Sequence, residues 1–161
     1  KFINKIANSI TLKKLQNKKL YSPEVAKLSS IIAKKPYVRK ALKGFQINFI
    51  KKSKLVVVEG RDIGSKIMPN ADLKLFFTCS TKEKAKRRLK EFKNLNKNIS
   101  LKKVEKALIQ RDKEDTKRKI SPLIMTKNAV LVDTTKLTIK QMEAKLINLV
   151  KKSIKKKYGN L

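Results

Sequence analysis

Histidine and tryptophan are both absent from this chain of 161 residues. Without imidazole, the sequence lacks the usual general base with a pKa near neutrality and the commonest metal ligand. A single cysteine, Cys79, excludes a disulfide within the chain. No apolar run approaches the roughly 20 residues that span a bilayer, and no signal-peptide pattern opens the sequence, so we expect a cytoplasmic protein without a membrane partner. Any chemistry therefore rests on Arg, Lys, Asp, Ser or backbone groups.

Acidic residues are scarce, with 12 Asp and Glu against 43 Lys and Arg and a formal net charge of +31. Such a surface attracts nucleic acids, nucleotides or anionic membranes without specific contacts. Most of the basic residues are lysines, which we interpret as solvated helix faces. Arginine instead offers a planar fork that grips a phosphate with two parallel hydrogen bonds. The first candidates for phosphate contacts are therefore the six arginines, Arg39, Arg61, Arg87, Arg88, Arg111 and Arg118.

Capping signals and apolar periodicity predict two helices in the first third of the chain. Residues 22–24, Ser-Pro-Glu, read as an N-cap followed by Pro and an acid in the first turn, which predicts a helix over 23–34. A second helix is expected from Pro36 to about residue 51. Residues 1–19 predict only a short helix or the edge of an insert. The second helix has an apolar face that we expect in the core, formed by Val38, Leu42, Phe45 and Phe49.

Continuous apolar runs indicate strands that alternate with further helices. Strands buried on both faces are predicted at 55–58, 73–79 and 129–132. Capping residues predict helices that begin at Ser80, Ser100 and Thr138, the first two running to about residue 92 and toward residue 118. This alternation predicts one α/β domain with a parallel sheet and helices on both of its faces.

The segment Glu-Gly-Arg-Asp-Ile-Gly at 59–64 directly follows the first predicted strand. Ligands in open α/β sheets bind at the carboxyl ends of the strands. Glycines allow a sharp turn and close approach of the backbone to a ligand, and Arg61 beside Asp62 places a phosphate-gripping group next to a hydrogen-bond acceptor. Taken alone, the motif fits a plain turn held by an Arg–Asp pair equally well.

A second group of charged residues lies on one face of the helix predicted toward residue 118. Arg111, Asp115 and Arg118 stand at positions i, i+4 and i+7. By itself this stripe fits an exposed ladder of ion pairs better than a ligand site. Together with residues 59–64, it favours a clamp that closes over a phosphate while the aspartate accepts hydrogen bonds from sugar hydroxyls.

Further motifs accompany these two segments in a fixed order. They are Ser-Pro-Glu-Val at 22–25, Ser30 with Pro-Tyr-Val-Arg at 36–39, Gly-Arg-Asp-Ile-Gly at 60–64, Lys-Arg-Arg at 86–88, Arg-Asp-x-x-Asp-x-x-Arg at 111–118 with Ser-Pro-Leu at 121–123, and Val-Leu-Val-Asp-Thr-Thr at 130–135. In this order and spacing, from about Leu20 to the final helix, the chain resembles the bacterial cytidylate kinase family. Lys84 departs from the pattern, because an Arg often stands there in the family.

The resemblance implies an enzyme, a phosphotransferase that moves the γ-phosphoryl group of ATP to CMP or dCMP and yields CDP or dCDP. It implies a P-loop nucleoside monophosphate kinase-like fold, Mg²⁺ bound with ATP, and a monomer without a specific nucleic-acid partner. Residues 1–20 would be the remainder of a CMP-binding insert, and 21–161 the kinase core with a lid at about 111–122.

The same resemblance implies roles for individual residues. Three of them match positions that read the cytosine ring: Ser30, Arg39 and Asp62. Arg61 and Arg118 match residues that hold the CMP phosphate, whereas Arg111 and Asp115 match residues that engage sugar and phosphates as the lid closes. These seven form the expected CMP site, with Arg61, Arg111 and Arg118 as catalytic residues. Arg87 and Arg88 are expected on the ATP side, and no metal ligand is expected from this chain.

The family's ATP site, a strand followed by a GxxxxGK[ST] loop and a helix, is missing from these residues. Gly64-Ser65-Lys66 has the wrong order and follows the wrong strand. We therefore expect the sequence, which opens on Lys1, to be incomplete at its N-terminus, to bind CMP weakly and to be inactive alone.

Two other interpretations remain open. The net charge suits a basic RNA-binding or ribosome-associated protein, although aromatic residues make up only 6% of the chain and no RNA-stacking motif is present. The second interpretation is a non-catalytic remnant of a kinase.

Overall fold

A computed structural model describes residues 2–94 and 98–159. The N-terminal part consists of three short helical segments, α1 (Phe2–Asn8), α2 (Leu12–Leu15) and the 3₁₀ turn η1 (Lys18–Tyr21). The short helix expected within residues 1–19 is therefore confirmed as several pieces. Residue 1 of the expected insert and residues 160 and 161 of the expected core lie outside the described residues.

The two helices predicted next are confirmed as α3 (Pro23–Ile32) and α4 (Pro36–Lys51). The Ser22 hydroxyl accepts a hydrogen bond from the backbone N–H of Val25, as expected for an N-cap. The prediction that the apolar face of α4 is core is wrong: Leu42 is 37% exposed and Phe49 45% exposed, and no residue of α4 is buried. Its apolar spacing is correct for a helix, but it packs mainly on the seven-residue α1, which is too short to cover it.

The sheet contains two parallel strands, β1 (Lys74–Thr78) and β2 (Ala129–Asp133), and both were predicted. Phe77 pairs with Val132, which is completely buried. The strand predicted at 55–58 is wrong, because this segment is irregular and the side chains of Leu55 and Val57 are 91% and 101% exposed. A strand needs a neighbour that completes its backbone hydrogen bonds, and no strand lies beside residues 55–58 within the described part of the chain.

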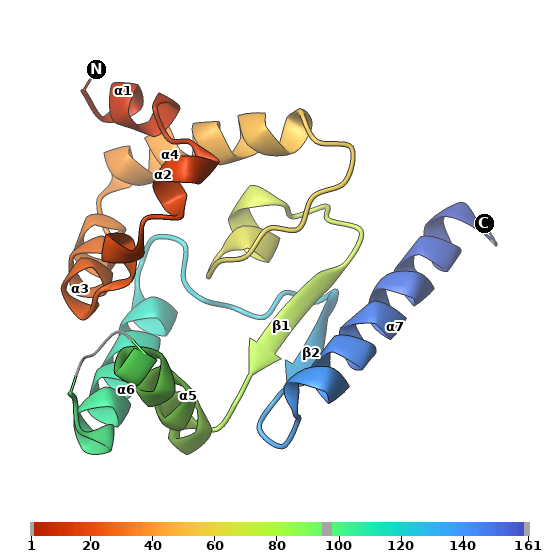
Figure 1. Cartoon of the computed structure of the whole chain (residues 1–161). Coiled ribbons are helices and arrows are strands. Elements are labelled where there is room, and N and C mark those ends of the chain that lie inside the picture. Colours follow the sequence, from red (N-terminus) through yellow and green to blue (C-terminus); the bar gives the residue numbers. More distant parts are fainter. Residues whose placement is uncertain (1, 95–97, 160–161) are drawn as a thin grey trace.

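Two helices lie between the strands, α5 (Thr81–Asn94) and α6 (Leu101–Lys117), and a third, α7 (Ile139–Tyr158), follows β2. Their predicted caps are present at Ser80, Ser100 and Thr138, which accept hydrogen bonds from backbone N–H groups of the first turns. The helices α5 and α6 pack side by side (Figure 1) around a small core of Ala85, Phe92 and Val104.

Figure 1 shows α7 beside β2, and Lys157 of α7 pairs with Asp72, just before β1, at 2.6 Å. The α/β class and the parallel pairing are thus confirmed. Helices do not fully cover the sheet, however, since Phe77 is 49% and Leu131 is 51% exposed. Within residues 2–94 and 98–159, no helix has both the length and the apolar character needed to cross a membrane.

The carboxyl ends of the strands are tied together and to α5, which sets the position of the site. The N–H of Thr134 donates to the Thr78 carbonyl (2.9 Å), and the N–H of Ser80 donates to the Thr135 hydroxyl (2.9 Å). The helix α5 therefore starts directly beside the end of β2.

Candidate functional site

The loop at 59–62 brings an arginine and an aspartate to the start of a short π-helical turn, η2 (Ile63–Ile67). Gly60 is required here by close packing, because a Cβ at this position would lie 2.8 Å from Cγ1 of Ile63. The N–H of Lys66 donates to the Asp62 carbonyl at 2.8 Å, which closes the turn. This geometry holds Arg61 and Asp62 side by side.

Asp62 forms an ion pair with Arg39, from the first turn of α4. The side chains of both residues are largely buried, at 13% and 19% exposed. The Arg39 guanidinium also donates to the carbonyl of Ala33, at the C-cap of α3 (3.1 Å). Ser30 lies on α3 three residues before Ala33 and is half-buried, but within the described chain no hydrogen bond joins it to Arg39 or Asp62. The structure thus brings together two of the three residues expected to read cytosine.

The charged stripe of α6 converges on Asp115, whose side chain is only 8% exposed. Nη1 of Arg118 lies 3.1 Å from Oδ1 of Asp115, and Nε of Arg61 lies 3.3 Å from Oδ2. Nε of Arg111 is 3.9 Å from the same Oδ2. The stripe is therefore no exposed ladder: one buried carboxylate faces three arginines, and Arg61 reaches it from a distant part of the sequence.

Two buried polar atoms of this group have no hydrogen-bond partner, Nε of Arg111 and Oδ2 of Asp115. A buried donor or acceptor without a partner is costly, by about 1–3 kcal/mol, so such atoms mark places where a ligand can supply the missing bond. An acceptor and a donor are thus available at the centre of the group.

Asp112, one turn before Asp115, extends the network to α5. Its Oδ1 lies 3.4 Å from Nη1 of Arg61, and its Oδ2 lies 2.8 Å from Nζ of Lys84. Neither Asp112 nor Lys84 was among the sequence-predicted site residues. The spacing of Asp112 and Asp115 at i and i+3 was a usable signal, because it puts two carboxylates on one helix face.

We call these eight residues the arginine cluster: Arg39, Arg61, Arg111, Arg118, Lys84, Asp62, Asp112 and Asp115. Five basic side chains face three carboxylates, so two positive charges are left uncompensated. Burial lowers the pKa of Arg118 below its ordinary value, opposed by the Asp115 carboxylate, and the neighbouring Arg39 lowers it further. An arginine nevertheless stays protonated in proteins. The cluster therefore attracts an anion.

A pocket of about 430 Å³ adjoins the cluster and shares Arg118 with it. This volume lies within the range of small-molecule sites, about 300–1,000 Å³. Lys34, in the turn between α3 and α4, pairs with Glu114 of α6 at 2.9 Å, which links this turn to the segment at about 111–122. The pocket is lined by Lys34, Glu114, Lys117, Arg118, Lys119 and Ile120.

Arg87 and Arg88 lie on α5 and hold other partners. Arg87 donates to the Thr134 hydroxyl and carbonyl at 3.1 and 2.7 Å, and so ties α5 to the end of β2. Arg88 pairs with Glu91 at 2.6 Å and lies 4.7 Å above the centre of the Phe92 ring. Within the described residues, neither guanidinium forms an ion pair with the arginine cluster.

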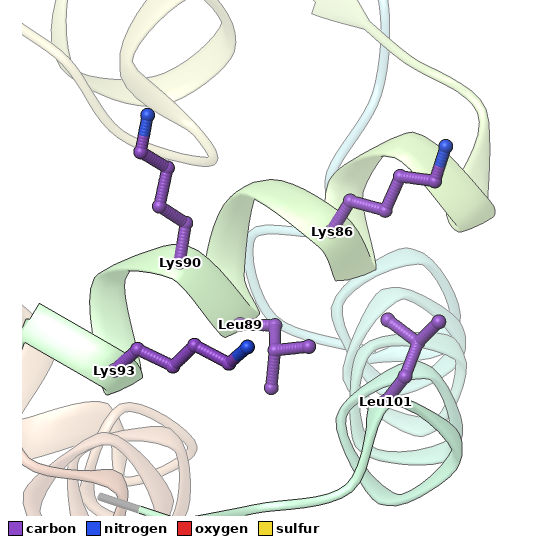
Figure 2. Close-up of a pocket in the computed structure, with 5 residues that line it drawn as sticks. All are labelled: Lys86, Leu89, Lys90, Lys93 and Leu101. Carbon is purple, nitrogen blue, oxygen red and sulfur yellow. The ribbon is translucent and has the colours of Figure 1, made fainter. Parts of the chain in front are cut away.

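A second depression, of about 250 Å³, lies between α5 and α6 (Figure 2). Its apolar residues, Leu89 and Leu101, pack against the small core of these two helices. Figure 2 shows Lys86 and Lys90 pointing away from α6, whereas Lys93 extends along the helix toward Leu89. The lining contains no hydrogen-bond acceptor side chain for a sugar, so we assign this depression to helix packing.

The acidic side chains of the cluster do not suit a metal ion, because each carboxylate already faces a basic side chain. In the described ranges, no group of three or more carboxylate or thiol side chains gathers as a metal site. A Mg²⁺ ion would have to be held mainly by ligands other than these residues, and we derive no step through it.

Comparisons with known proteins identify one family. The family model for cytidylate kinase matches residues 2–152. The cytidylate kinase of Thermotoga neapolitana is 40% identical over 137 residues, which cover 85% of this chain and 62% of that protein. That of Carboxydothermus hydrogenoformans is 40% identical over 129 residues, covering 80% of this chain and 58% of that protein.

A bifunctional pantoate ligase/cytidylate kinase of Trichodesmium erythraeum is 46% identical over 131 residues, which cover 81% of this chain and 25% of that larger protein. The chain thus spans about 60% of the length of the curated single-function relatives cited above. Since the family model extends over nearly the whole sequence, the chain belongs to the cytidylate kinase family.

Proposed function

We propose that these 161 residues form the CMP-binding and lid portion of an enzyme that transfers the γ-phosphoryl group of ATP to CMP or dCMP. The observation that carries the proposal is the arginine cluster around the buried Asp115, with its excess of two positive charges. A phosphate monoester carries about two negative charges at neutral pH, so its charge complements that excess.

We assign the CMP phosphate to Arg61 and Arg118, whose guanidiniums are held from one side by Asp115. Arginine binds phosphate in a bidentate manner, so two such residues can hold the nucleophilic phosphate in one orientation. Oδ2 of Asp115 has ion-pair neighbours but accepts no hydrogen bond, so it is suited to accept one from a sugar hydroxyl, and Nε of Arg111 is suited to donate to a phosphate oxygen. Both contacts would complete as the segment at about 111–122 closes.

Cytosine recognition is assigned to Ser30, Arg39 and Asp62. Cytosine presents an amino donor where uracil presents a carbonyl acceptor. The Asp62 carboxylate therefore matches cytosine and repels uracil, while Arg39 and Ser30 donate to the acceptors of the ring. The Arg39–Asp62 pair is already in place, so each group is oriented before the base arrives.

Phosphoryl transfer needs positioning and cancellation of charge more than covalent catalysis. This explains how a chain without histidine can serve it. The GxxxxGK[ST] motif that cradles ATP phosphates is not among the residues of this sequence, so we propose that they transfer phosphate poorly by themselves. Mg²⁺ would enter with ATP. The ATP-side role predicted for Arg87 and Arg88 requires each guanidinium to exchange its contact with Thr134 or Glu91 for a phosphate.

The test is nucleotide binding to the 161-residue chain, measured by titration calorimetry at about 0.15 M salt. We expect CMP to bind more tightly than UMP and AMP, and cytidine to bind more weakly than CMP because it lacks the phosphate. Equal affinities for CMP and UMP would contradict the assigned base readers. Absence of binding by every nucleotide would contradict the proposal as a whole.

The net charge of +31 favours one other function, binding to nucleic acid through release of counterions from its phosphates. This alternative predicts affinity for RNA tighter than about 1 μM at 0.15 M salt, without stabilisation by CMP. The same calorimeter distinguishes the two, because CMP is a single phosphate monoester whereas an RNA engages many lysines at once.

A further inference from the structure

Asp112 joins three segments that are far apart in the sequence. Its two carboxylate oxygens face different cations, Oδ1 facing Nη1 of Arg61 at 3.4 Å and Oδ2 facing Nζ of Lys84 at 2.8 Å. The loop at 59–62, the first turns of α5 and the last turns of α6 therefore meet on one side chain, which is 33% exposed. None of the roles assigned above involves this residue.

The two carboxylates of α6 flank the Arg61 guanidinium at different nitrogens. Nε faces Asp115 at 3.3 Å and Nη1 faces Asp112 at 3.4 Å. A guanidinium has five N–H donors. Nη1 donates one N–H to Asp112, while Nε faces Asp115 as an ion pair, so the second N–H of Nη1 and both N–H groups of Nη2 remain. One N–H from each of these two nitrogens points out of the end of the guanidinium. A phosphate binds this end through two parallel hydrogen bonds.

We propose that Asp112 is a positioning residue, which fixes the plane of Arg61 so that the end of its fork faces the CMP phosphate. Lys84 acts one step further away by holding the other oxygen of Asp112 in place. The inference rests on the proposed function for its consequence on CMP, but its structural part concerns only Arg61. Without Asp112, Asp115 is the one remaining ion-pair partner of Arg61 among the described residues, and the guanidinium can rotate about that single contact.

The sign of the effect separates this role from simple electrostatics. Removal of a carboxylate near an anion site leaves the site more positive, so charge alone predicts tighter CMP binding. Loss of positioning predicts weaker binding, because the free fork end must be reoriented when the phosphate arrives. A merely structural role would affect CMP and cytidine alike.

The experiment compares the wild-type chain with Asp112→Ala and with Glu143→Ala, which removes the same charge from an exposed position on α7. We expect Asp112→Ala to weaken CMP about tenfold, the order of one charge-assisted hydrogen bond, and to leave cytidine unchanged. Glu143→Ala should leave both affinities as they are. Unchanged or tighter CMP binding by Asp112→Ala would overturn the proposal.

A second measurement reads Arg61 directly and needs no ligand. In ¹⁵N relaxation of the Arg61 Nε–H group, assigned with Arg61→Lys, we expect larger motion in Asp112→Ala and an intermediate increase in Lys84→Met. If the wild-type chain fails to bind CMP while Arg61 moves more in both variants, the proposed function is overturned and the positioning role of Asp112 is supported. If the wild-type chain binds CMP and Arg61 is equally ordered in all variants, the positioning role of Asp112 is overturned and the proposed function stands.

Discussion

Replacement of Arg118 by lysine is the sharpest test of the phosphate site. The Arg118 side chain is only 10% exposed, and it donates through Nη1 to Asp115 and through Nε to the Ser121 carbonyl. Three N–H donors remain for a phosphate. A lysine ammonium has three donors in total, so after contact with Asp115 and Ser121 it keeps one.

Arg118→Lys therefore loses one of two phosphate bonds while the charge is retained. A charge-assisted hydrogen bond contributes about 1.5–3 kcal/mol, which corresponds to a decrease in CMP affinity of about 10- to 150-fold. Titration calorimetry measures this directly. Urea unfolding monitors the stability of the fold in parallel. We expect the free energy of unfolding to fall by about 1–2 kcal/mol, because the contacts to Asp115 and Ser121 are weakened.

The matched control is Lys155→Ala on the exposed side of α7, which removes a positive charge far from the cluster. If charge alone governed affinity, this variant would weaken CMP while Arg118→Lys would not. An equal CMP affinity in Arg118→Lys and wild type would refute the assignment of Arg118 to the phosphate. Equal losses in both variants would show that the basic surface as a whole, and no fork of hydrogen bonds, attracts the nucleotide.

Three further predictions test other parts of the molecule. Asp62→Ala should weaken CMP more than ATP in calorimetry, and an unchanged CMP affinity would remove Asp62 from the site. A hydrogen bond from Lys34 lowers the pKa of Glu114 below its ordinary value of 4.5, so this pair stabilises the fold above that pH and the stabilisation is lost as pH falls through the lower folded-state value. In Glu114→Gln, the free energy of unfolding measured in urea should therefore depend less on pH in the acid range, and a pH dependence identical to wild type would contradict this. Gly60→Ala should disturb the 59–62 loop and weaken CMP, since its Cβ would lie 2.8 Å from a neighbouring side-chain carbon, whereas Gly44→Ala on α4, with nothing within 4 Å, should stabilise the chain by about 0.5–1 kcal/mol. Equal CMP affinities of Gly60→Ala and Gly44→Ala in calorimetry would refute the packing argument.

Helix boundaries were predictable from the sequence because the signals that set them are local. Ser22, Ser100 and Thr138 each cap a helix through a hydrogen bond to a backbone N–H three residues away. The pair Arg111 and Asp115 was equally local, since helical geometry places positions i and i+4 on one face. Arg118 instead follows the end of α6 with extended backbone and reaches Asp115 through its side chain. Two of the three predicted strands form as well, because each finds the other as its neighbour.

Pairing and burial were decided by the tertiary structure. The run at 55–58 has the composition of a buried strand, yet Leu55 and Val57 are exposed because no described strand lies beside it. The apolar face of α4 has helical spacing but stays half-exposed, because the short helix α1 does not cover it. Periodicity states which residues share a face and leaves open what covers that face.

The charged network divides in the same way. The sequence by itself determined that Arg111 and Asp115 share one helix face and that Arg61 stands next to Asp62 in a turn. Only the tertiary structure decided that Arg61 reaches Asp115 from 54 positions away in the chain, and that Asp112 connects it to Lys84. The physical reason is that capping and helical periodicity act within a few residues, whereas an ion pair between distant segments depends on how the whole chain packs.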